Sequence, residues 1–184
     1  MPDSNVLALV GSLRAASVNR QLAELAADTA PAGVTVNVYD GLGDLPFYNE
    51  DLDLAPEAGG APESVVALRA AAAAADAALV VTPEYNGSIP GVLKNAIDWL
   101  SRPFGNGALK DKPLAVVGAA GGQYGGVWAH DETRKSFGVA GPRVVESIKL
   151  SVPLKSLDGK HPGENAELVE NVRDVVGKLV AEVG

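Results

Sequence analysis

Residues 11–19 bring anion-binding groups together directly after an apolar segment that ends at Gly11. The side chains that donate hydrogen bonds there belong to Ser12, Arg14, Ser17 and Asn19. A helix beginning near Val18 adds free backbone N–H groups, and the arginine offers a planar fork of donors suited to phosphate. Because one charge-assisted hydrogen bond contributes about 1.5–3 kcal/mol, three or four of them hold a monophosphate even in an acidic protein. The segment therefore predicts a phosphate site.

Two simpler interpretations of this segment stay open from the residues alone. Ser17 can serve as an ordinary helix cap, and Arg14 can be a solvated surface residue. Their combination between an apolar segment and a helix favours phosphate binding. A nucleoside triphosphate is less favoured, because the segment lacks the Gly-Lys-Ser/Thr ending that cradles phosphates and seats magnesium. The dinucleotide pattern is also missing, since its nearest approach at residues 41–46 lacks the third glycine.

Pro83 and Gly87 frame a second turn. Proline restricts the backbone to one φ angle and glycine permits the angles that a tight turn needs, so the pair is typical of a rigid turn. Asn86 between them tolerates unusual backbone angles. Such a turn directs backbone N–H and C=O groups at the edge of a planar ring. Tyr85 either covers one face of that ring or is a partly buried core residue, and Glu84 taken alone is a solvated carboxylate. We therefore expect this turn to line a ring.

Residues 119–126 form a third turn, which is rich in glycine. Gly121 and Gly122 allow the backbone to approach a ligand closely, and Gln123 and Tyr124 are candidate neighbours of a ring. The simpler interpretation is a flexible loop. Taken together, the three turns predict a singly phosphorylated planar cofactor, which suits FMN better than FAD.

The elements between these turns alternate regularly between strand and helix. Apolar or alternating runs predict strands at residues 5–10, 34–38, 77–82, 113–118 and 144–152, the last at a sheet edge. Helical patterns cover residues 18–30, 63–75, 89–100, 127–137 and 165–183, and a long loop covers residues 41–60. This alternation predicts an α/β fold in one domain, residues 1–184: a flavodoxin-like three-layer sandwich with a five-stranded parallel sheet in the order 2-1-3-4-5. In that order, the turns after strands one, three and four meet at one edge.

The composition describes an acidic chain of 184 residues with no cysteine and a formal net charge of −8. Such a charge repels nucleic acid, and the lack of cysteine excludes disulfides and zinc thiolate sites; no metal site is expected. The longest apolar stretch, residues 70–81, is too short to cross a bilayer, and no signal peptide is visible. We therefore expect no membrane partner and a cytoplasmic location. His130 and His161, the only histidines, are expected to be surface or packing residues.

At these turns the chain resembles the NADPH-dependent FMN reductase family, whose members include quinone, azo-dye and chromate reductases. The resemblance rests on GSLRAASVN at residues 11–19 and PEYNGSIPGVLKNAIDWL at residues 83–100, with weaker support from residues 45–52 and 121–126. It extends to about Gly141. In such proteins the flavin carries the redox chemistry, so the resemblance implies no catalytic side chain.

The family pattern also implies which residues contact FMN. Phosphate contacts are implied at Ser12, Arg14, Ser17, Val18 and Asn19. Ring contacts are implied at Pro83, Glu84, Tyr85, Asn86 and Gly87, with Gly121, Gly122 and Gln123 on the other side. Relatives often carry serine where this chain has Ala119 and Ala120, so fewer side-chain contacts are expected there.

The resemblance further implies an activity. NADPH or NADH gives a hydride to FMN and leaves, and a small electron acceptor such as a quinone, free flavin, azo compound or metal oxyanion takes its place in ping-pong order. Family members form homodimers and sometimes homotetramers, and the helix at residues 89–100 is either a subunit surface or ordinary sheet packing. Two other functions stay open: a non-enzymatic flavodoxin-type electron carrier, and a ligand-sensing or scaffolding protein. Neither the acceptor nor the preferred nicotinamide follows from the sequence.

Overall fold

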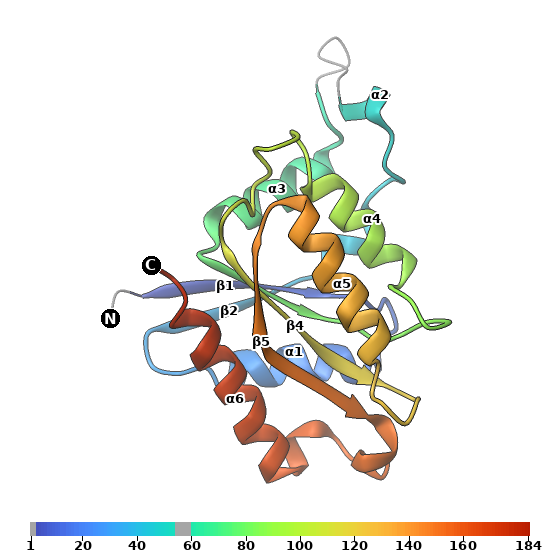
Figure 1. Cartoon of the computed structure of the whole chain (residues 1–184), viewed down its shortest axis with the longest axis vertical. Helices are drawn as coiled ribbons and strands as arrows, with labels where there is room; N and C mark the ends of the chain where they lie inside the picture. Colours follow the sequence, from blue (N-terminus) through green and yellow to red (C-terminus); the bar gives the residue numbers. More distant parts are fainter. Residues whose placement is uncertain (1–2, 54–59) are drawn as a thin grey trace.

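The computed structural model describes residues 3–53 and 60–184. Within them, five strands form one parallel sheet in the order β2-β1-β3-β4-β5 (Figure 1). The strands are β1 (Ser4–Val10), β2 (Val34–Tyr39), β3 (Ala77–Val81), β4 (Pro113–Ala120) and β5 (Arg143–Pro153). The predicted fold class, the strand order and the edge position of the last strand are confirmed.

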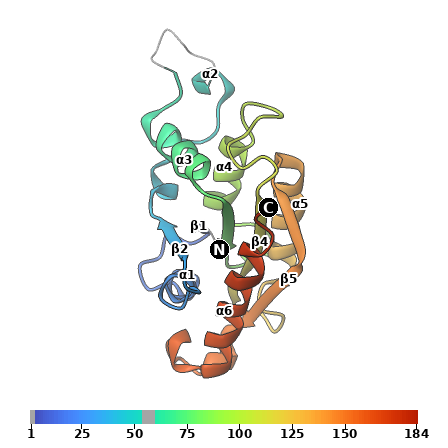
Figure 2. The same cartoon turned by 90° about the vertical axis from the view of Figure 1, so that its left-hand side faces the viewer.

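Helices cover both faces of this sheet (Figure 2). On one face lie α1 (Val18–Asp28) and α6 (Ala166–Val180). The other face is covered by α3 (Glu63–Ala74), α4 (Gly91–Leu100) and, beside α4, α5 (Val127–Ala140). None of the helices in the described residues is long and apolar enough to cross a membrane.

The sheet separates two apolar cores. Because side chains alternate along a strand, β1 sends Val6 and Ala8 into the core beneath α1 and α6, and Leu7 and Leu9 into the core beneath α3 and α4. Trp99 of α4 is fully buried in the second core. The apolar stripe of α4 therefore packs on the sheet, as the packing interpretation of that helix predicts.

The prediction of a long loop at residues 41–60 is partly wrong, because α4 orders part of that segment. Asn95 Nδ2 and the indole N–H of Trp99 both donate to the carbonyl oxygen of Pro46, at 2.9 and 2.8 Å. These bonds hold the chain against the helix. Within the segment, the chain forms the 3-10 turn η1 (Gly41–Asp44) and the short helix α2 (Glu50–Asp53). Residues 54–59 of the predicted loop lie outside the described residues.

Other boundaries differ from the predicted ones by a few residues. The helix α4 begins at Gly91 rather than at residue 89, because Pro90 stands at its N-cap. The helix α5 runs on to Ala140, where Gly141 with a φ of 125° ends it. Two further 3-10 turns connect β5 to α6, namely η3 (Leu154–Leu157) and η4 (Pro162–Glu164).

Candidate functional site

The turns that follow β1, β3 and β4 meet at the carboxyl edge of the sheet. The backbone N–H of Gly11 donates to the carbonyl of Val81 (2.9 Å), and that of Thr82 donates to the carbonyl of Val117 (3.0 Å). A Cβ atom on Gly11 would lie 2.3 Å from Thr82 Oγ1, and one on Gly118 would lie 2.1 Å from the Thr82 carbonyl oxygen. Only glycine fits at both positions, and the three predicted segments lie side by side.

The N-terminus of α1 follows the first of these segments, and its first N–H groups have no partner within the helix. Ser17 occupies the N-cap position and is only 3% exposed, yet its side chain makes no capping hydrogen bond in the described structure. The first turn of α1, which begins at Val18, also contains no acidic residue. The interpretation of Ser17 as an ordinary side-chain cap is therefore not supported, and the positive end of the helix suits an anion.

Arg14 is exposed and folds back over its own segment. Its Nη2 donates to the carbonyl two residues further along (2.9 Å), which leaves the other guanidinium donors for a ligand. Ser12 and Arg14 line a hollow of about 320 Å³ beside β2. Arg20 also lines it but pairs with Asp40 (2.5 Å) and Glu24 (2.9 Å), and the bond to Asp40 in particular raises the pKa of Arg20. Of the two arginines, only Arg14 has no carboxylate partner in the described structure.

Asn19 is buried, and its side chain has a structural role that the sequence did not reveal. The amide Nδ2 donates to the carbonyl of Ala119, and the backbone N–H of Ala119 donates to Oδ1, each at 2.8 Å. This pair of bonds fastens the start of α1 to the end of β4. What Asn19 offers to a phosphate is therefore its backbone N–H and the second hydrogen of its amide.

The second segment forms the tight turn that its residues predict. Asn86 and Gly87 both have positive φ angles, 54° and 73°, as a two-residue hairpin turn requires. Tyr85 and Ser88 flank them and exchange two backbone hydrogen bonds of 3.1 Å each. The side chain of Tyr85 is 50% exposed, which excludes its interpretation as a core residue and leaves it free to face a ligand. Pro83, before the turn, is buried.

Glu84 is not the solvated carboxylate that its isolated position suggests. Its Oε2 accepts a hydrogen bond from the backbone N–H of Ala129 (3.1 Å), in the first turn of α5. The N-cap residue of α5 is Gly126, which has no side chain to satisfy this N–H. Glu84 therefore caps a helix from another segment. In the next turn of α5, Glu132 accepts a bond from the Ser88 hydroxyl (2.6 Å).

The third segment is a hydrogen-bonded turn with an open outer side. The backbone N–H of Gly125 donates to the carbonyl of Gly122 (3.0 Å), and a Cβ on Gly125 would lie 2.6 Å from the backbone of β5. By contrast, a Cβ on Gly121 or Gly122 would meet nothing within 4 Å. Gln123 and Tyr124 are exposed at the tip. The turn is therefore fixed at its base and offers its first two glycines to a ligand.

Trp128 is a residue of this edge that the sequence analysis missed. It stands in the first turn of α5 and is 59% exposed. Its ring centroid lies 6.0 Å from that of Tyr124, and a Cβ on Gly87 would lie 3.9 Å from its Cε3. Trp128 thus stands between the second and third turns. The only signal for it in the sequence was an aromatic residue directly after a glycine-rich segment.

His130 is a buried packing residue and His161 is a surface residue, as expected. His130 is fully buried, with Nε2 2.9 Å from the carbonyl oxygen of Thr82 and Nδ1 2.7 Å from the hydroxyl of Ser151. Burial lowers the pKa of His130 below its ordinary value, and the nearby charge of Arg134 acts in the same direction. His161 is exposed and caps η4 by accepting a bond from a backbone N–H.

The residues at this edge fit a flavin mononucleotide. The start of α1 with Ser17 and Arg14 offers donors for one phosphate group, and the open side of Gly121 leaves room for a ring. In the described residues, no group of three or more His, Asp and Glu side chains is arranged to hold a metal ion. Glu84 and His130 are already engaged by backbone groups, so neither offers a free acid–base group at this edge.

Comparisons with known proteins point to the same chemistry. The family model of the NADPH-dependent FMN reductases matches residues 4–156. A quinone reductase of Pseudomonas putida is 39% identical over 167 residues, which cover 91% of this chain and 82% of that protein. A 2-hydroxy-1,4-benzoquinone reductase of a Burkholderia species is 43% identical over 129 residues, covering 70% of this chain and 67% of the relative. The structure of FerB, a flavoenzyme NAD(P)H:(acceptor) oxidoreductase from Paracoccus denitrificans, matches with a TM-score of 0.78 at 32% identity, covering 98% of this chain and 95% of that one.

The matched region contains the whole sheet and all three turns of the carboxyl edge. The quinone reductase of Pseudomonas putida and FerB extend that agreement over most of their own length. The chain belongs to the NADPH-dependent FMN reductase family.

Proposed function

We propose that this protein is an FMN-dependent NAD(P)H oxidoreductase that passes electrons to a small acceptor such as a quinone, free flavin, azo compound or metal oxyanion. The observation that carries the proposal is the meeting of two features at one sheet edge. One is the start of α1, where the Ser17 side chain makes no capping bond in the described structure. The other is the tight turn at residues 83–88, whose backbone is fixed and whose Tyr85 is exposed.

The phosphate of FMN is assigned to the start of α1. Backbone N–H groups there, from Val18 and Asn19 onward, present the positive end of the helix. Ser12 and Ser17 add hydroxyl donors, and Arg14 adds the free donors of its guanidinium. These contacts neutralise a phosphate locally, which a chain with a net charge of −8 requires.

The ring is assigned to the space between the second and third turns. The backbone of residues 83–87 lines one edge, and Gly121, Gly122 and Gln123 line the other. When bound, FMN would supply the redox chemistry, namely hydride acceptance from NADH or NADPH and transfer of two electrons to the acceptor. The fixed N–H groups of the turn stabilise negative charge that develops on a reduced ring, because they need no rearrangement.

The exposed aromatic side chains of this edge offer stacking faces for planar partners. Tyr85, Tyr124 and Trp128 are each at least half exposed and come from two neighbouring turns and the start of α5. Aromatic rings stack in offset geometry with other planar groups. We assign to them the nicotinamide and then the acceptor, one after the other in the same space, which gives ping-pong kinetics. A flavodoxin-type electron carrier is not favoured, since the family and its named relatives are reductases.

Binding and turnover measurements test the proposal. Titration of the purified protein with FMN should give one tight site per chain. The loaded protein should oxidise NADH or NADPH rapidly only when benzoquinone, ferricyanide or an azo dye is added, with parallel lines in double-reciprocal plots. A protein that binds no FMN, or one that binds FMN but oxidises neither nicotinamide, would rule the proposal out.

Assembly as a homodimer or homotetramer is part of the proposal. Phe104 and Val139 are 87% and 82% exposed and border a cavity of about 500 Å³ between the carboxyl ends of α4 and α5. Light scattering should give at least twice the chain mass of 18.8 kDa. The double variant Phe104→Ser with Val139→Ser should shift the mass toward the monomer. A wild-type protein that is monomeric would contradict this part of the proposal.

A further inference from the structure

A buried chain of hydrogen bonds links α5, β5 and the start of the second turn. His130 of α5 is its centre, with Nε2 2.9 Å from the Thr82 carbonyl oxygen and Nδ1 2.7 Å from the Ser151 hydroxyl. We propose that His130 is a positioning residue that fixes the Thr82 carbonyl and thereby aims the backbone of residues 83–88 at the flavin ring. This inference rests on the proposed function.

The partners of His130 fix which ring nitrogen carries the proton. A carbonyl oxygen only accepts hydrogen bonds, so the neutral imidazole has its hydrogen on Nε2 and donates it to Thr82. Nδ1 then accepts from the hydroxyl of Ser151. Since His130 is fully buried, turning its ring would break both bonds and leave the Thr82 carbonyl without the imidazole donor. Ser151 therefore holds the ring in the orientation that Thr82 needs.

The Thr82 carbonyl needs a side-chain partner because the sheet ends there. The ladder between β3 and β4 ends with the pair Val81 and Val117, and the N–H of Thr82 still reaches the carbonyl of Val117. The absence of a side chain at Gly118 makes room for the contact of His130 with the Thr82 carbonyl. A Cβ atom on Gly118 would lie 2.1 Å from the Thr82 carbonyl oxygen and 2.9 Å from His130 Nε2. The imidazole thus replaces the next rung of the ladder at the point where the chain turns away.

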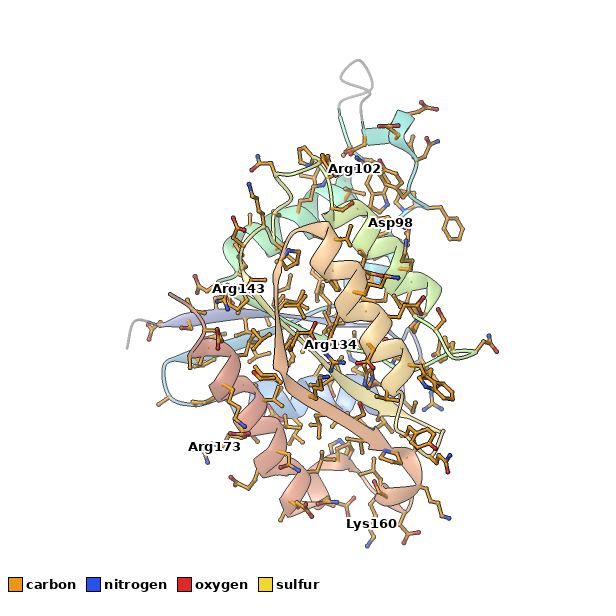
Figure 3. The ribbon with its side chains drawn as sticks, in the orientation of Figure 1. Asp98, Arg102, Arg134, Arg143, Lys160 and Arg173 are labelled. Carbon is orange, nitrogen blue, oxygen red and sulfur yellow. The ribbon has the colours of Figure 1, made fainter. Side chains whose placement is uncertain are left out.

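Two further contacts show that α5 holds the whole turn. The backbone N–H of Ala129 donates a hydrogen bond to the carboxylate of Glu84, and the carboxylate of Glu132 accepts one from the hydroxyl of Ser88. Together with the hydrogen bond from His130 to the Thr82 carbonyl, these contacts place residues of α5 at the start, middle and end of the turn. One turn further along α5, Arg134 lies between the helix and the sheet and donates to the carbonyl of Val116 at 2.7 Å (Figure 3). The first turns of α5 are therefore anchored on β4 while they hold the ring-edge turn.

The consequence of losing this hold is specific to the reduced cofactor. The backbone N–H groups of the turn stabilise the cofactor most strongly where negative charge develops, which is on the reduced ring. The phosphate contacts at α1 are the same in both oxidation states. A variant without the His130 bond should therefore bind oxidised FMN nearly normally and reduced FMN more weakly. A tenfold selective loss lowers the two-electron potential of bound FMN by about 30 mV.

The test compares His130→Phe, which keeps a flat ring but has no donor, with His130→Gln, whose amide can still donate to Thr82. The matched control is His161→Phe, the same exchange at the exposed histidine of η4. Redox-dye titration measures the potential, fluorescence quenching measures the affinity for oxidised FMN, and amide hydrogen exchange of the apo-protein measures protection at residues 83–89. Ser151→Ala serves as a second, milder variant in case His130→Phe does not fold.

We expect His130→Phe to lower the potential by about 30 mV or more and to reduce protection of the turn. His130→Gln should restore most of both, Ser151→Ala should shift the potential in the same direction by less, and His161→Phe should match the wild type. An unchanged potential in both His130→Phe and Ser151→Ala, with FMN still bound, would overturn this inference alone. A wild-type protein that binds no FMN would instead overturn the proposed function.

Discussion

The segment at residues 12–19 and the turn at residues 83–88 end at the same edge of the sheet, but they are held in different ways. Most of the first is shaped by its own bonds: Arg14 donates to a carbonyl two residues away, and the N–H of Ser17 donates to the carbonyl of Arg14. At its end, Asn19 is fastened from outside, to Ala119 of β4. The second is held from outside by α5, through His130 and Glu132 among others. A segment that holds a phosphate needs free donors, and a turn that borders a reacting ring needs a fixed backbone.

The comparison predicts that the largest effect follows a change where the two segments meet. Gly118→Ala places a Cβ 2.1 Å from the carbonyl oxygen of Thr82. Because backbone must move to accept it, the free energy of unfolding should fall by about 3 kcal/mol, at the upper end of overpacking effects. Urea denaturation of the apo-protein measures this. The control is Gly121→Ala, whose Cβ meets nothing within 4 Å and should change stability little; equal losses in both variants would contradict the packing described here.

Arg14→Ala tests the free donors of the first segment. The affinity for FMN should fall roughly tenfold to hundredfold, the loss expected for one charge-assisted hydrogen bond, while the apo-protein should keep its stability. Fluorescence titration measures the affinity for FMN, and thermal melting measures the stability of the apo-protein. Arg20→Ala is the matched control, because that arginine lines the same hollow but is already paired with Asp40. A variant Arg14→Ala that melts early and binds FMN normally would make Arg14 structural.

Glu84→Ala tests the outside support of the second turn. Removing the cap of α5 should lower the melting temperature of the apo-protein by about 2–4 °C, the equivalent of roughly 1 kcal/mol in a chain of this size. Glu84→Gln keeps an oxygen that can accept from Ala129 and should recover most of the loss. If both variants melt at the wild-type temperature, the bond between Glu84 and α5 adds nothing to stability.

The smallest effect is a dependence of stability on pH. Burial, aided by the charge of Arg134, lowers the pKa of folded His130 below its ordinary value of 6.5, although the bond to Thr82 and the charges of Glu84 and Asp131 act in the opposite direction. Below pH 6.5 the unfolded chain binds a proton that the folded chain does not, so acid favours unfolding. The contribution is complete above that pH and is lost as the pH falls toward the folded pKa.

Denaturation of wild type and His130→Gln on both sides of pH 6.5 measures this dependence. The wild type should lose stability more steeply on the acid side than the variant, which has no group to protonate at this position. If the stability of both proteins fell equally steeply below pH 6.5, His130 would not be the group that governs the loss of stability in acid.

The sequence predicts the fold well because its evidence is local. Each strand is a short apolar run, each helix has its own periodicity, and their alternation leaves few arrangements. The failure at residues 41–60 has a non-local cause, since Asn95 and Trp99 of α4 order that segment from 49 and 53 positions away. Nothing within the loop itself indicates this hold.

The candidate site divides in the same way. The donors at residues 11–19 and the turn at Asn86 and Gly87 are local patterns, and the structure shows the predicted turn. The bonds of Asn19 to Ala119 and of Glu84 to Ala129 join residues that are 100 and 45 positions apart. Such partners depend on the packed fold. The sequence therefore predicts Asn19 and Glu84 as contacts of a ligand, and it does not predict the hydrogen bonds by which they position the turns of this edge.

Amide hydrogen exchange with and without FMN tests the central claim most directly, because it reports on every segment of the chain at once. Binding should increase protection at residues 12–19, 83–88 and 121–126 together. The cavity of about 500 Å³ between the carboxyl ends of α4 and α5, lined in part by Phe104, should show no change. Protection confined to that cavity, or FMN binding that leaves the three turns unaltered, would contradict the account.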